Sequence, residues 1–590
     1  MDEKKQGSRQ SMPEAQEVFL QPGQSAALDD GGAVTLHQAH KHRAYEEWEK
    51  AYNCFRQLML SATKANRPAL KQDVLNCLPR LRNLNLVASL EGLEEDIREF
   101  RLQPHVDGSE IRPLCNHLFH VKYNHSGAQF KIDQLAEDSF LLDCLANDYF
   151  ADPEIETFVT EIRRQVLLVS ARDLQIHDIY FNLYQVFCIQ SYLTDFVLYR
   201  APEEDKIITQ LETILSGHIS EDELQIRDIA PILLLLSMYK PLLETPAAAL
   251  LKNLELDDLP EYLHTAFSLT VLEPLDLDRR ESGIENAGSI HPDSAAVAEQ
   301  YGKFPYPRHP RLGYLPAPVN YRGRNPHLDD TQLKRCVLDE NPLEILVAGC
   351  GTGFQAAQIA LSCMNASVTG IDISRRSLAY ADRLRESYEI DNLSLLQADI
   401  TNLPEALPTG QSFFHVVECV GVLHHLADPE AGLTQLLKML KPGGFINLGL
   451  YSEIARQPVQ TIRELNEKIH MSPGTENIRQ FRRQFMTSKL DDSMRAVLGM
   501  RDFYTMNGCK DLLFNKVEHC FTIPRIKSLL EQHNLKFIGF HFGGPMAEQI
   551  YYKMFPEERS LRVLDNWQLL EEKFPDTFRQ MYRFHCQKPE

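Results

Sequence analysis

Short apolar runs alternate with helical patterns between residues 343 and 450, and this alternation limits the fold more than any other feature. The runs lie at 343–348, 367–372, 393–399, 413–419 and 443–450. Apolar residues with helical spacing follow the first two runs, at 355–364 and 375–388. Continuously apolar strands joined by helices are typical of a parallel sheet covered on both faces. The sequence therefore predicts a doubly wound α/β domain.

The first run ends in a loop with three glycines, Gly349, Gly351 and Gly353. In doubly wound sheets this loop usually contacts a ligand. A nucleoside-triphosphate loop needs Gly-Lys-Ser/Thr, whereas Gly353 is followed by Phe354 and Gln355. A dinucleotide loop needs a third glycine where Phe354 stands, so a pyrophosphate ligand is disfavoured.

The chain before this domain has a different character. Residues 1–40 are polar and have no secretory signal, which favours a disordered tail. From there to about residue 275, apolar residues recur at helical spacing, and no repeat of 34 to 45 residues aligns. We therefore expect a helical domain over 41–290. The apolar stretch 230–243 is shorter than the roughly 20 residues that cross a membrane, so it predicts a buried helix.

A proline-rich segment, 291–328, separates the two parts. Its portion 303–328 holds six prolines, five basic residues, no acidic residue and the aromatic residues Phe304, Tyr306, Tyr314 and Tyr321. Such a segment cannot form a regular helix. It is either an extended connector on the next domain or an arm beside the active site.

Length and charge narrow the class of protein. A chain of 590 residues exceeds one hydrophobic core, so two or more domains are expected. The net charge of -21 argues against a general nucleic-acid or membrane surface. Twelve cysteines without a CxxC pair indicate neither a structural metal site nor a disulfide framework, and reduced thiols favour a cytoplasmic location.

Several motifs carry a family resemblance. The segments ILVAGCGTG, VTGIDIS, LLQADI, FFHVVECVGVLHHL and LKPGGF resemble, in order, the motifs of class I S-adenosylmethionine-dependent methyltransferases. The outer segments AEQYGKFPYPRHPRL, FYTMNGCKDLLFNKVEHCFTIPRI, LKFIGFHF and FPDTFRQMYRFHCQK resemble a bacterial subgroup with a fused, tetratricopeptide-like helical region. The chain departs from that subgroup at Gly302 and Lys303, where acidic residues are usual, and at His585, where an indole is usual.

The resemblance implies a Rossmann-like, seven-stranded domain over 329–590, preceded by an all-α domain. It implies strands at 535–542 and 581–588, the latter an antiparallel edge strand, and a helical insert at 452–522. The implied cofactor is S-adenosyl-L-methionine, and the implied activity is methyl transfer by in-line displacement, EC class 2.1.1. This chemistry needs no metal, because the positive charge on sulfur disappears in the reaction.

The loop and the next two strands supply the expected cofactor site. A Cβ at Gly349 or Gly351 would block the methionine part of the cofactor from the main chain. Asp372 is placed to accept hydrogen bonds from the ribose hydroxyls, since Ser374 can cap the next helix. The resemblance implies that Asp399 contacts the adenine amino group. Asp399 could instead be a simple turn residue. The remaining expected contacts are Cys350, Gly353, Ile373, the Ile400 backbone and Glu418.

Candidate catalytic residues are Glu418, His424 and Tyr451. Glu418 ends the strand 413–419, either facing the crevice or solvated. His424 and the adjacent His425 are either bases or packing residues of the following helix. A base is required for an amine or hydroxyl acceptor, whereas a carboxylate acceptor needs none.

The insert is either a structural cover or a substrate-recognition lid. Its residues Arg479, Arg482 and Arg483 would suit an acidic or phosphorylated acceptor. A helical region this large favours a protein acceptor or partner over a small molecule. A small-molecule or lipid methyltransferase and a non-catalytic scaffold are the alternatives, and the oligomeric state stays open.

Overall fold

The computed structural model describes the chain except residues 1–25, 28–32, 104–105, 107, 124–129, 221–223, 309–310, 314–316, 329–336, 404–412, 543–544, 559 and 580. The chain divides into two compact units, residues 1–128 and 129–590. This division falls inside the helical domain predicted over 41–290. The boundaries predicted at 291–328 and 329–590 stay predictions.

The first unit is helical where it is described. Its main helices are α1 Leu36–Ala44, α2 Trp48–Ser61, α3 Arg67–Cys77, α4 Leu90–Arg101 and α5 Arg112–Tyr123. Helix α1 begins inside the segment 1–40, for which a disordered tail is predicted, so that prediction is wrong from residue 36 onward. A capping box explains the early start, because the Thr35 side chain accepts a hydrogen bond from the Gln38 backbone N–H and the Gln38 side chain accepts one from the Thr35 backbone N–H.

The second unit begins with a further helical region. Its helices are α6 Ile132–Ala136, α7 Ser139–Asn147, α8 Pro153–Ser170, α9 Phe181–Leu193, α10 Pro202–Ile219, α11 Ile226–Ser237, α12 Ala248–Leu251, α13 His264–Phe267 and α14 Glu273–Gly283. The predicted buried helix is α11, whose residues Leu233 to Leu236 are fully buried. Among the described helices, none combines the length and the apolar character that a membrane span requires.

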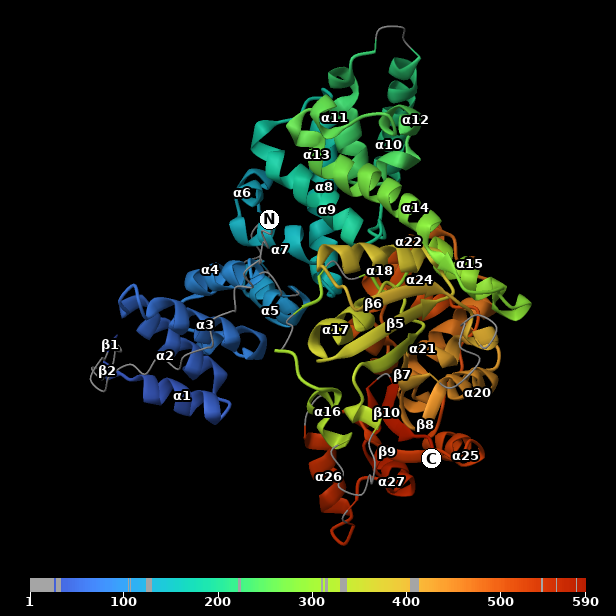
Figure 1. The fold of residues 1–590 in the computed structure, drawn as a ribbon. Coiled ribbons are helices and arrows are strands. Elements are labelled where there is room, and N and C mark those ends of the chain that lie inside the picture. The colour runs from blue at the N-terminus through green and yellow to red at the C-terminus, as the bar shows by residue number, and fades with distance from the viewer. Residues whose placement is uncertain are drawn as a thin grey trace, which may run out of the picture. The chain divides into compact units, whose positions relative to one another are not determined.

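An eight-stranded sheet forms the core of the second unit, in the order β3-β6-β5-β4-β7-β8-β10-β9 (Figure 1). The strands are β3 Glu285–Asn286, β4 Leu343–Ala348, β5 Ala366–Asp372, β6 Leu393–Gln397, β7 Phe414–Val420, β8 Leu440–Tyr451, β9 Lys536–Phe540 and β10 Met581–Gln587. All pairs are parallel except those of β10 with β8 and β9. The predicted Rossmann-like, seven-stranded fold is confirmed, and the two-residue strand β3 is an addition at one edge.

The final strand differs from its prediction in one respect. β10 is antiparallel, as expected, but it lies between β8 and β9 and not at the edge. It pairs with β8 over seven residues, from Met581 to Gln587, and with β9 on its other side. Because both of its sides are paired, the five-residue β9 takes the edge.

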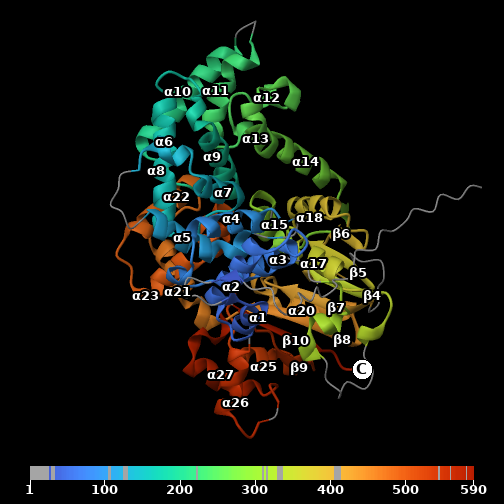
Figure 2. The same ribbon diagram turned by 90° about the vertical axis from the view of Figure 1, so that its left-hand side faces the viewer.

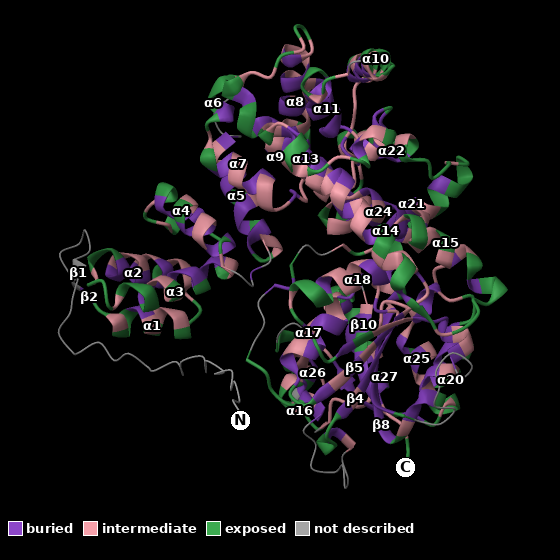
Figure 3. Ribbon diagram, turned by 45° about the horizontal axis from the view of Figure 1, so that its top comes forward, coloured by how far each residue is buried: buried purple, intermediate pink, exposed green. Residues whose placement is uncertain are grey.

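Helices cover both faces of the sheet, whose strands are largely buried (Figure 3). Side chains of a strand alternate between the two faces. Ile345 and Val347 therefore face the helices α17 and α18, whereas Leu346 and Ala348 face α20, α25 and α27. The helices of this part are α15 Ala295–Lys303, α16 Tyr321–Arg324, α17 Phe354–Ser362, α18 Arg375–Ser387, α20 Pro429–Met439, α25 Ile523–Gln532, α26 Met546–Met554 and α27 Leu564–Lys573.

Residues 452–522 pack against the helical region of the same unit. They form α21 Glu453–Lys468, α22 Thr475–Thr487, α23 Asp492–Arg495 and α24 Met506–Phe514. Figures 1 and 2 both place α22 next to α8 and α9. Apolar residues of this insert form one buried cluster with Tyr149 and Val197. The insert therefore joins the sheet domain to the helical region.

Arg479, Arg482 and Arg483 of this insert contact the helical region. Arg482 is buried and donates to both carboxylate oxygens of Glu156, at 3.0 and 2.6 Å. Arg479 donates to the Phe196 carbonyl oxygen, and Arg483 to the Thr157 hydroxyl. The charge of Arg482 is therefore used in a buried ion pair, contrary to the expectation that it serves an acidic acceptor.

Removing one partner of the buried Arg482–Glu156 pair should destabilise the protein. The substitution Glu156→Ala leaves a buried guanidinium without its counter-charge, a loss that typically costs about 3–5 kcal/mol. We expect a corresponding fall in the free energy of unfolding, measured by urea titration. The control Glu203→Ala removes a half-exposed partner of Arg164 and should cost less than about 1 kcal/mol. Equal losses in the two variants would contradict this prediction.

Candidate active site

A cavity of about 340 Å³ lies beyond the carboxyl ends of the central strands. Its sheet side consists of Gly349, Cys350, Gly351, Asp372, Ile373, Ala398, Asp399 and Ile400. Its other side comes from the proline-rich segment and the insert, with Tyr301, Tyr306, Tyr451, Arg456, Asp502 and Asp511. Expected cofactor residues and residues from two distant segments thus meet in one cavity.

The loop after β4 presents bare main chain to this cavity. Gly351 has a φ of +54°, and its backbone N–H donates to Oδ2 of Asp372 at 2.8 Å. A Cβ at Gly351 would lie 3.3 Å from the Tyr306 carbonyl oxygen. The Thr352 hydroxyl donates to the Pro307 carbonyl oxygen. The proline-rich segment therefore packs directly on the glycine loop, as the arm interpretation of that segment expects.

Gly353 has a different function from the one expected. It lies outside the cavity lining, and its φ is +89° at the start of α17. A Cβ there would lie 2.5 Å from the Ala381 Cβ in α18. The missing side chain therefore permits close packing of two helices, and Gly353 supplies no direct contact to a ligand in this cavity.

Asp372 lies at the carboxyl end of β5 with both oxygens held by backbone N–H groups. Oδ1 accepts from Ser374 at 2.9 Å and Oδ2 accepts from Gly351. Burial raises the pKa of Asp372, and these hydrogen bonds oppose that rise. Ser374 caps α18 by accepting from the Ser377 N–H, as expected. Each carboxylate oxygen keeps a further lone pair for a hydroxyl of a ligand.

Asp399 lines the cavity and also stabilises its own turn. Its Oδ1 accepts from the backbone N–H and the hydroxyl of Thr401, and its Oδ2 accepts from the His291 N–H at 2.9 Å. The turn interpretation therefore describes its protein contacts. Ile373 and Ile400 line the same part of the cavity, where an adenine contact of Asp399 stays a prediction.

Glu418 does not face the crevice, contrary to expectation. β7 continues two residues beyond it to Val420, and the Glu418 side chain is buried outside the cavity lining. Its carboxylate accepts hydrogen bonds from Tyr321, Gln355 and Asn447 at 2.5, 2.9 and 2.6 Å. Because these donors use both oxygens, Glu418 belongs to a buried polar cluster and contacts neither a cofactor nor an acceptor in the cavity.

His424 is a packing residue, whereas Tyr451 and His425 line the cavity. The His424 ring stacks on the Tyr451 ring with centroids 3.7 Å apart. It is fully buried, and burial lowers its pKa far below the usual value, so it stays neutral. The Arg456 guanidinium lies 3.9 Å from the Tyr451 ring centroid. The catalytic prediction for His424 is therefore wrong in position, and that for Tyr451 stays a prediction.

Two carboxylates opposite the glycine loop are absent from the predicted site. The Tyr306 hydroxyl donates to Asp502 at 2.5 Å, and the Tyr301 hydroxyl donates to Asp511 at 2.6 Å. Burial raises the pKa of Asp502. Asp502 lies directly before the segment FYTMNGCKDLLF and Asp511 lies within it. The only sequence signal for them is the family resemblance of the whole segment. The local positive charge of the insert draws attention to its arginines and not to these aspartates.

The described cysteines agree with the absence of a disulfide framework. None of the eleven described cysteines forms a disulfide, and ten of them are buried. Cys350 lies on the cavity wall, and burial raises the pKa of its thiol well above the usual value. It therefore stays a protonated thiol and contributes a small apolar surface.

Comparisons with known proteins agree with this geometry. Residues 340–497 match the methyltransferase domain family. The chain is 36% identical to an uncharacterised protein of Synechococcus sp. over 186 residues, 31% of this chain and 43% of that protein. It is 33% identical to a ubiquinone biosynthesis O-methyltransferase of Vibrio atlanticus over 103 residues, 18% of this chain and 41% of that protein. The chain thus spans less than half the length of these relatives.

Solved structures similar to this chain include PKMT2 from Rickettsia typhi in complex with AdoHcy. That structure has a TM-score of 0.33 and 16% sequence identity, and the match covers 42% of this chain and 49% of that one. The cofactor of the methyltransferase domain is S-adenosylmethionine. The residues present fit this group, because Gly349, Cys350 and Gly351 line the cavity and Asp372 offers acceptors for two hydroxyls.

The substitution Asp372→Asn should weaken binding of S-adenosylmethionine. It removes charge-assisted hydrogen bonds, each worth about 1.5–3 kcal/mol, so we expect a roughly 10- to 100-fold rise in the dissociation constant. Isothermal titration calorimetry measures this change. The exposed Asp391→Asn, in the same domain, should bind as the parent does. Parent-like affinity in Asp372→Asn would show that Asp372 does not contact the cofactor.

Proposed function

We propose that the protein is an S-adenosylmethionine-dependent methyltransferase whose acceptor is an amine of a protein side chain. The observation that carries this proposal is the juxtaposition, in one cavity, of the glycine loop and Asp372 with Asp502, Asp511 and their tyrosine partners. The first group suits the cofactor. The second group forms a wall on which an acceptor would lie.

The charge of the cavity favours a cationic acceptor. Its described lining holds the carboxylates of Asp293, Asp372, Asp399, Asp502 and Asp511, against the single guanidinium of Arg456. The positive charge of Arg456 is neutralised by the buried Glu518 carboxylate, to which it donates two hydrogen bonds. Tyrosine rings attract an ammonium group through their faces, and carboxylates accept its N–H bonds. An acidic or phosphorylated acceptor would meet repulsion here.

The same wall can accept the proton that an ammonium acceptor loses. Bound S-adenosylmethionine supplies an electrophilic methyl group on a sulfonium. Asp502 is half-buried and its pKa is raised, so it is a stronger proton acceptor than an exposed carboxylate. Tyr306 holds this carboxylate in place through its hydroxyl. Alignment of the two reactants contributes roughly 7–11 kcal/mol to lowering the barrier.

A path from the cavity toward the helical region supports a protein acceptor. A second cavity of about 230 Å³ shares Tyr306, Pro307 and Asp502 with the first and reaches Tyr149 and Leu193. A third, of about 440 Å³, shares Asp195, Arg308 and Asn507 with the second and extends over α9 and α14. A polypeptide could lie along these cavities while one side chain enters the first. The tetratricopeptide-like character of the helices stays a prediction.

Two rival functions make different predictions. A small-molecule or lipid methyltransferase, the class named for the matched ubiquinone-pathway relatives, would label material that organic solvent extracts. A non-catalytic scaffold would bind neither S-adenosylmethionine nor a methyl acceptor. The intact glycine loop and the acceptors of Asp372 favour cofactor binding.

A transfer assay tests the proposal. The protein is incubated with methyl-labelled S-adenosylmethionine and cell extract. We expect label in acid-precipitable, protease-sensitive material that resists mild alkali, because an N-methyl group resists hydrolysis and a methyl ester does not. Asp502→Asn should lower the rate about 100-fold or more, the usual contribution of a general base. The exposed Asp492→Asn, in the same insert, should act as the parent does.

Each other outcome contradicts part of the proposal. Alkali-labile label in protein would indicate a carboxylate acceptor. Label in the organic extract would indicate a small molecule or lipid. Parent-like labelling by Asp372→Ala would place the cofactor elsewhere, and failure of the parent to bind S-adenosylmethionine in calorimetry would favour the scaffold.

A further inference from the structure

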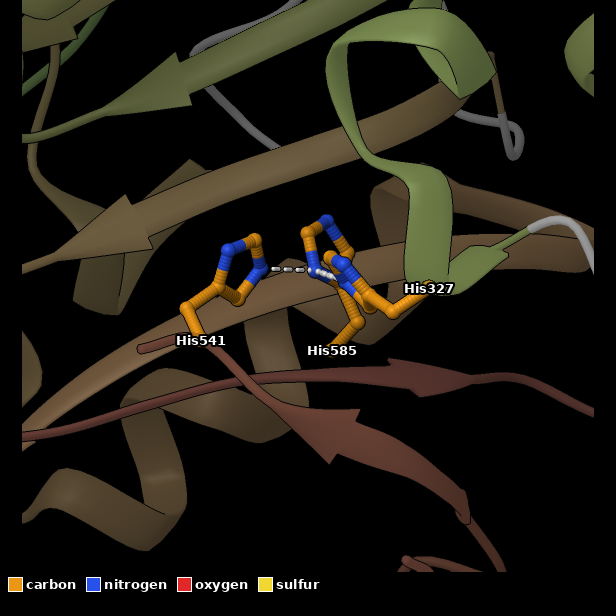
Figure 4. Close-up of side chains that lie close together, drawn as sticks. All are labelled: His327, His541 and His585. Carbon is orange, nitrogen blue, oxygen red and sulfur yellow. Dashed lines mark hydrogen bonds between the residues drawn. The ribbon is translucent and has the colours of Figure 1, made fainter. Parts of the chain in front are cut away.

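Three histidines from separate segments converge beside β9 and β10, outside the lining of the cavity described above. They are His327 in the short 3₁₀ helix Pro326–Leu328, His541 directly after β9, and His585 in β10 (Figure 4). One ring nitrogen of each lies within 4.8 Å of the others. None of the three lines the cavity that holds the glycine loop. His585 is fully buried, and the other two are half-buried.

Protein hydrogen bonds alone satisfy this cluster poorly. The Nδ1 atom of His585 lies 2.5 Å from Nε2 of His541 and 2.9 Å from Nε2 of His327. The Tyr321 hydroxyl donates to Glu418, so its oxygen accepts from Nε2–H of His585 at 3.1 Å. His585 is then unprotonated at Nδ1, where its single in-plane lone pair faces two ring nitrogens. One of these contacts is left without a well-directed hydrogen bond.

The outer contacts of His585 are those of a metal ligand. Ligating histidines usually donate their second ring N–H to an oxygen that is itself held in place. Here the chain runs from His585 to Tyr321 and then to the Glu418 carboxylate. Glu418, Asn447 and His585 are directly paired across β7, β8 and β10, so they form one polar row on the α17 face. This row fixes the His585 ring in the buried sheet.

We propose that His327, His541 and His585 bind a zinc-class divalent transition metal ion through Nε2, Nε2 and Nδ1. Three imidazoles suit zinc and its neighbours, whereas calcium and magnesium prefer oxygen ligands. Zinc–nitrogen bonds of about 2.0–2.1 Å place tetrahedral ligands about 3.3 Å apart, so the rings separate slightly on binding. A fourth position stays open for water, and the half-exposed His327 and His541 provide the entry path.

The ion would tie three parts of the chain together. His327 belongs to the segment that precedes the sheet domain, and His541 and His585 belong to its last two strands. The segment of His327 also carries Tyr321, which packs against the sheet. Metal binding therefore holds this segment against β9 and β10. Its three ligands lie outside the lining of the proposed methyl-transfer cavity, so this proposal does not depend on the proposed acceptor.

Metal titration of the full chain, without an affinity tag, tests this proposal. After chelator treatment and dialysis, the protein is titrated with Co²⁺ in the visible range and with Zn²⁺ by calorimetry. We expect one equivalent of tightly bound ion, a four-coordinate Co²⁺ spectrum without a thiolate charge-transfer band, and a higher melting temperature with Zn²⁺. The absence of a stoichiometric site in the parent protein would overturn the proposal.

Variants assign the ligands. His541→Gln and His327→Gln should each lose affinity by more than the roughly 10- to 100-fold cost of a missing outer partner, and Tyr321→Phe should show that smaller loss. The exposed His470→Gln serves as the matched control and should bind as the parent does. Circular dichroism checks that each variant folds. The two histidines come from independent segments, so if one variant unfolds, the other still tests the proposal. Parent-like binding in a folded His541→Gln or His327→Gln variant would contradict the proposal.

Discussion

The hydrogen bond from the Gly351 backbone to the Asp372 carboxylate sets the geometry on which the candidate site depends. It joins the loop after β4 to the end of β5, two neighbouring strands of the sheet. The loop can take this path because Gly351 adopts a positive φ, and its missing Cβ lets the Tyr306 carbonyl oxygen approach closely. A ligand thus meets main chain on one side and a carboxylate on the other.

The second half of the cavity depends on contacts made far from it. Asp502 and Asp511 belong to the insert, which is anchored to the helical region by the Arg482–Glu156 ion pair and by a shared apolar cluster. Tyr301 and Tyr306 come from the proline-rich segment and hold these carboxylates through their hydroxyls. The acceptor wall is therefore assembled from two segments about 200 residues apart in sequence, as the separations of 210 and 196 residues show.

The sequence predicts best where one local pattern determines the structure. The strands β4 and β5 are found to within one residue, because a continuous apolar run allows them only a buried position between helices. Prediction fails where the place of a side chain or strand depends on partners that are distant in sequence. Glu418 looks like a strand end because polar residues usually leave the core, yet Tyr321, Gln355 and Asn447 satisfy it within the core. The edge position expected for β10 fails for the same reason, since no local signal reveals that β9 pairs outside it.

The row of Glu418, Asn447 and His585 across three strands limits which substitutions these positions tolerate. Glu418 accepts hydrogen bonds from Asn447 and Tyr321, and the Tyr321 hydroxyl also bonds to His585, in a core that water does not reach. Replacing one member by an apolar residue would strand polar atoms of the others, at a penalty comparable to a lost core side chain. A substitution at one of these positions would therefore need a compensating change among the residues that bond to it, and single replacements here are costly even though the row lies outside the cavity lining.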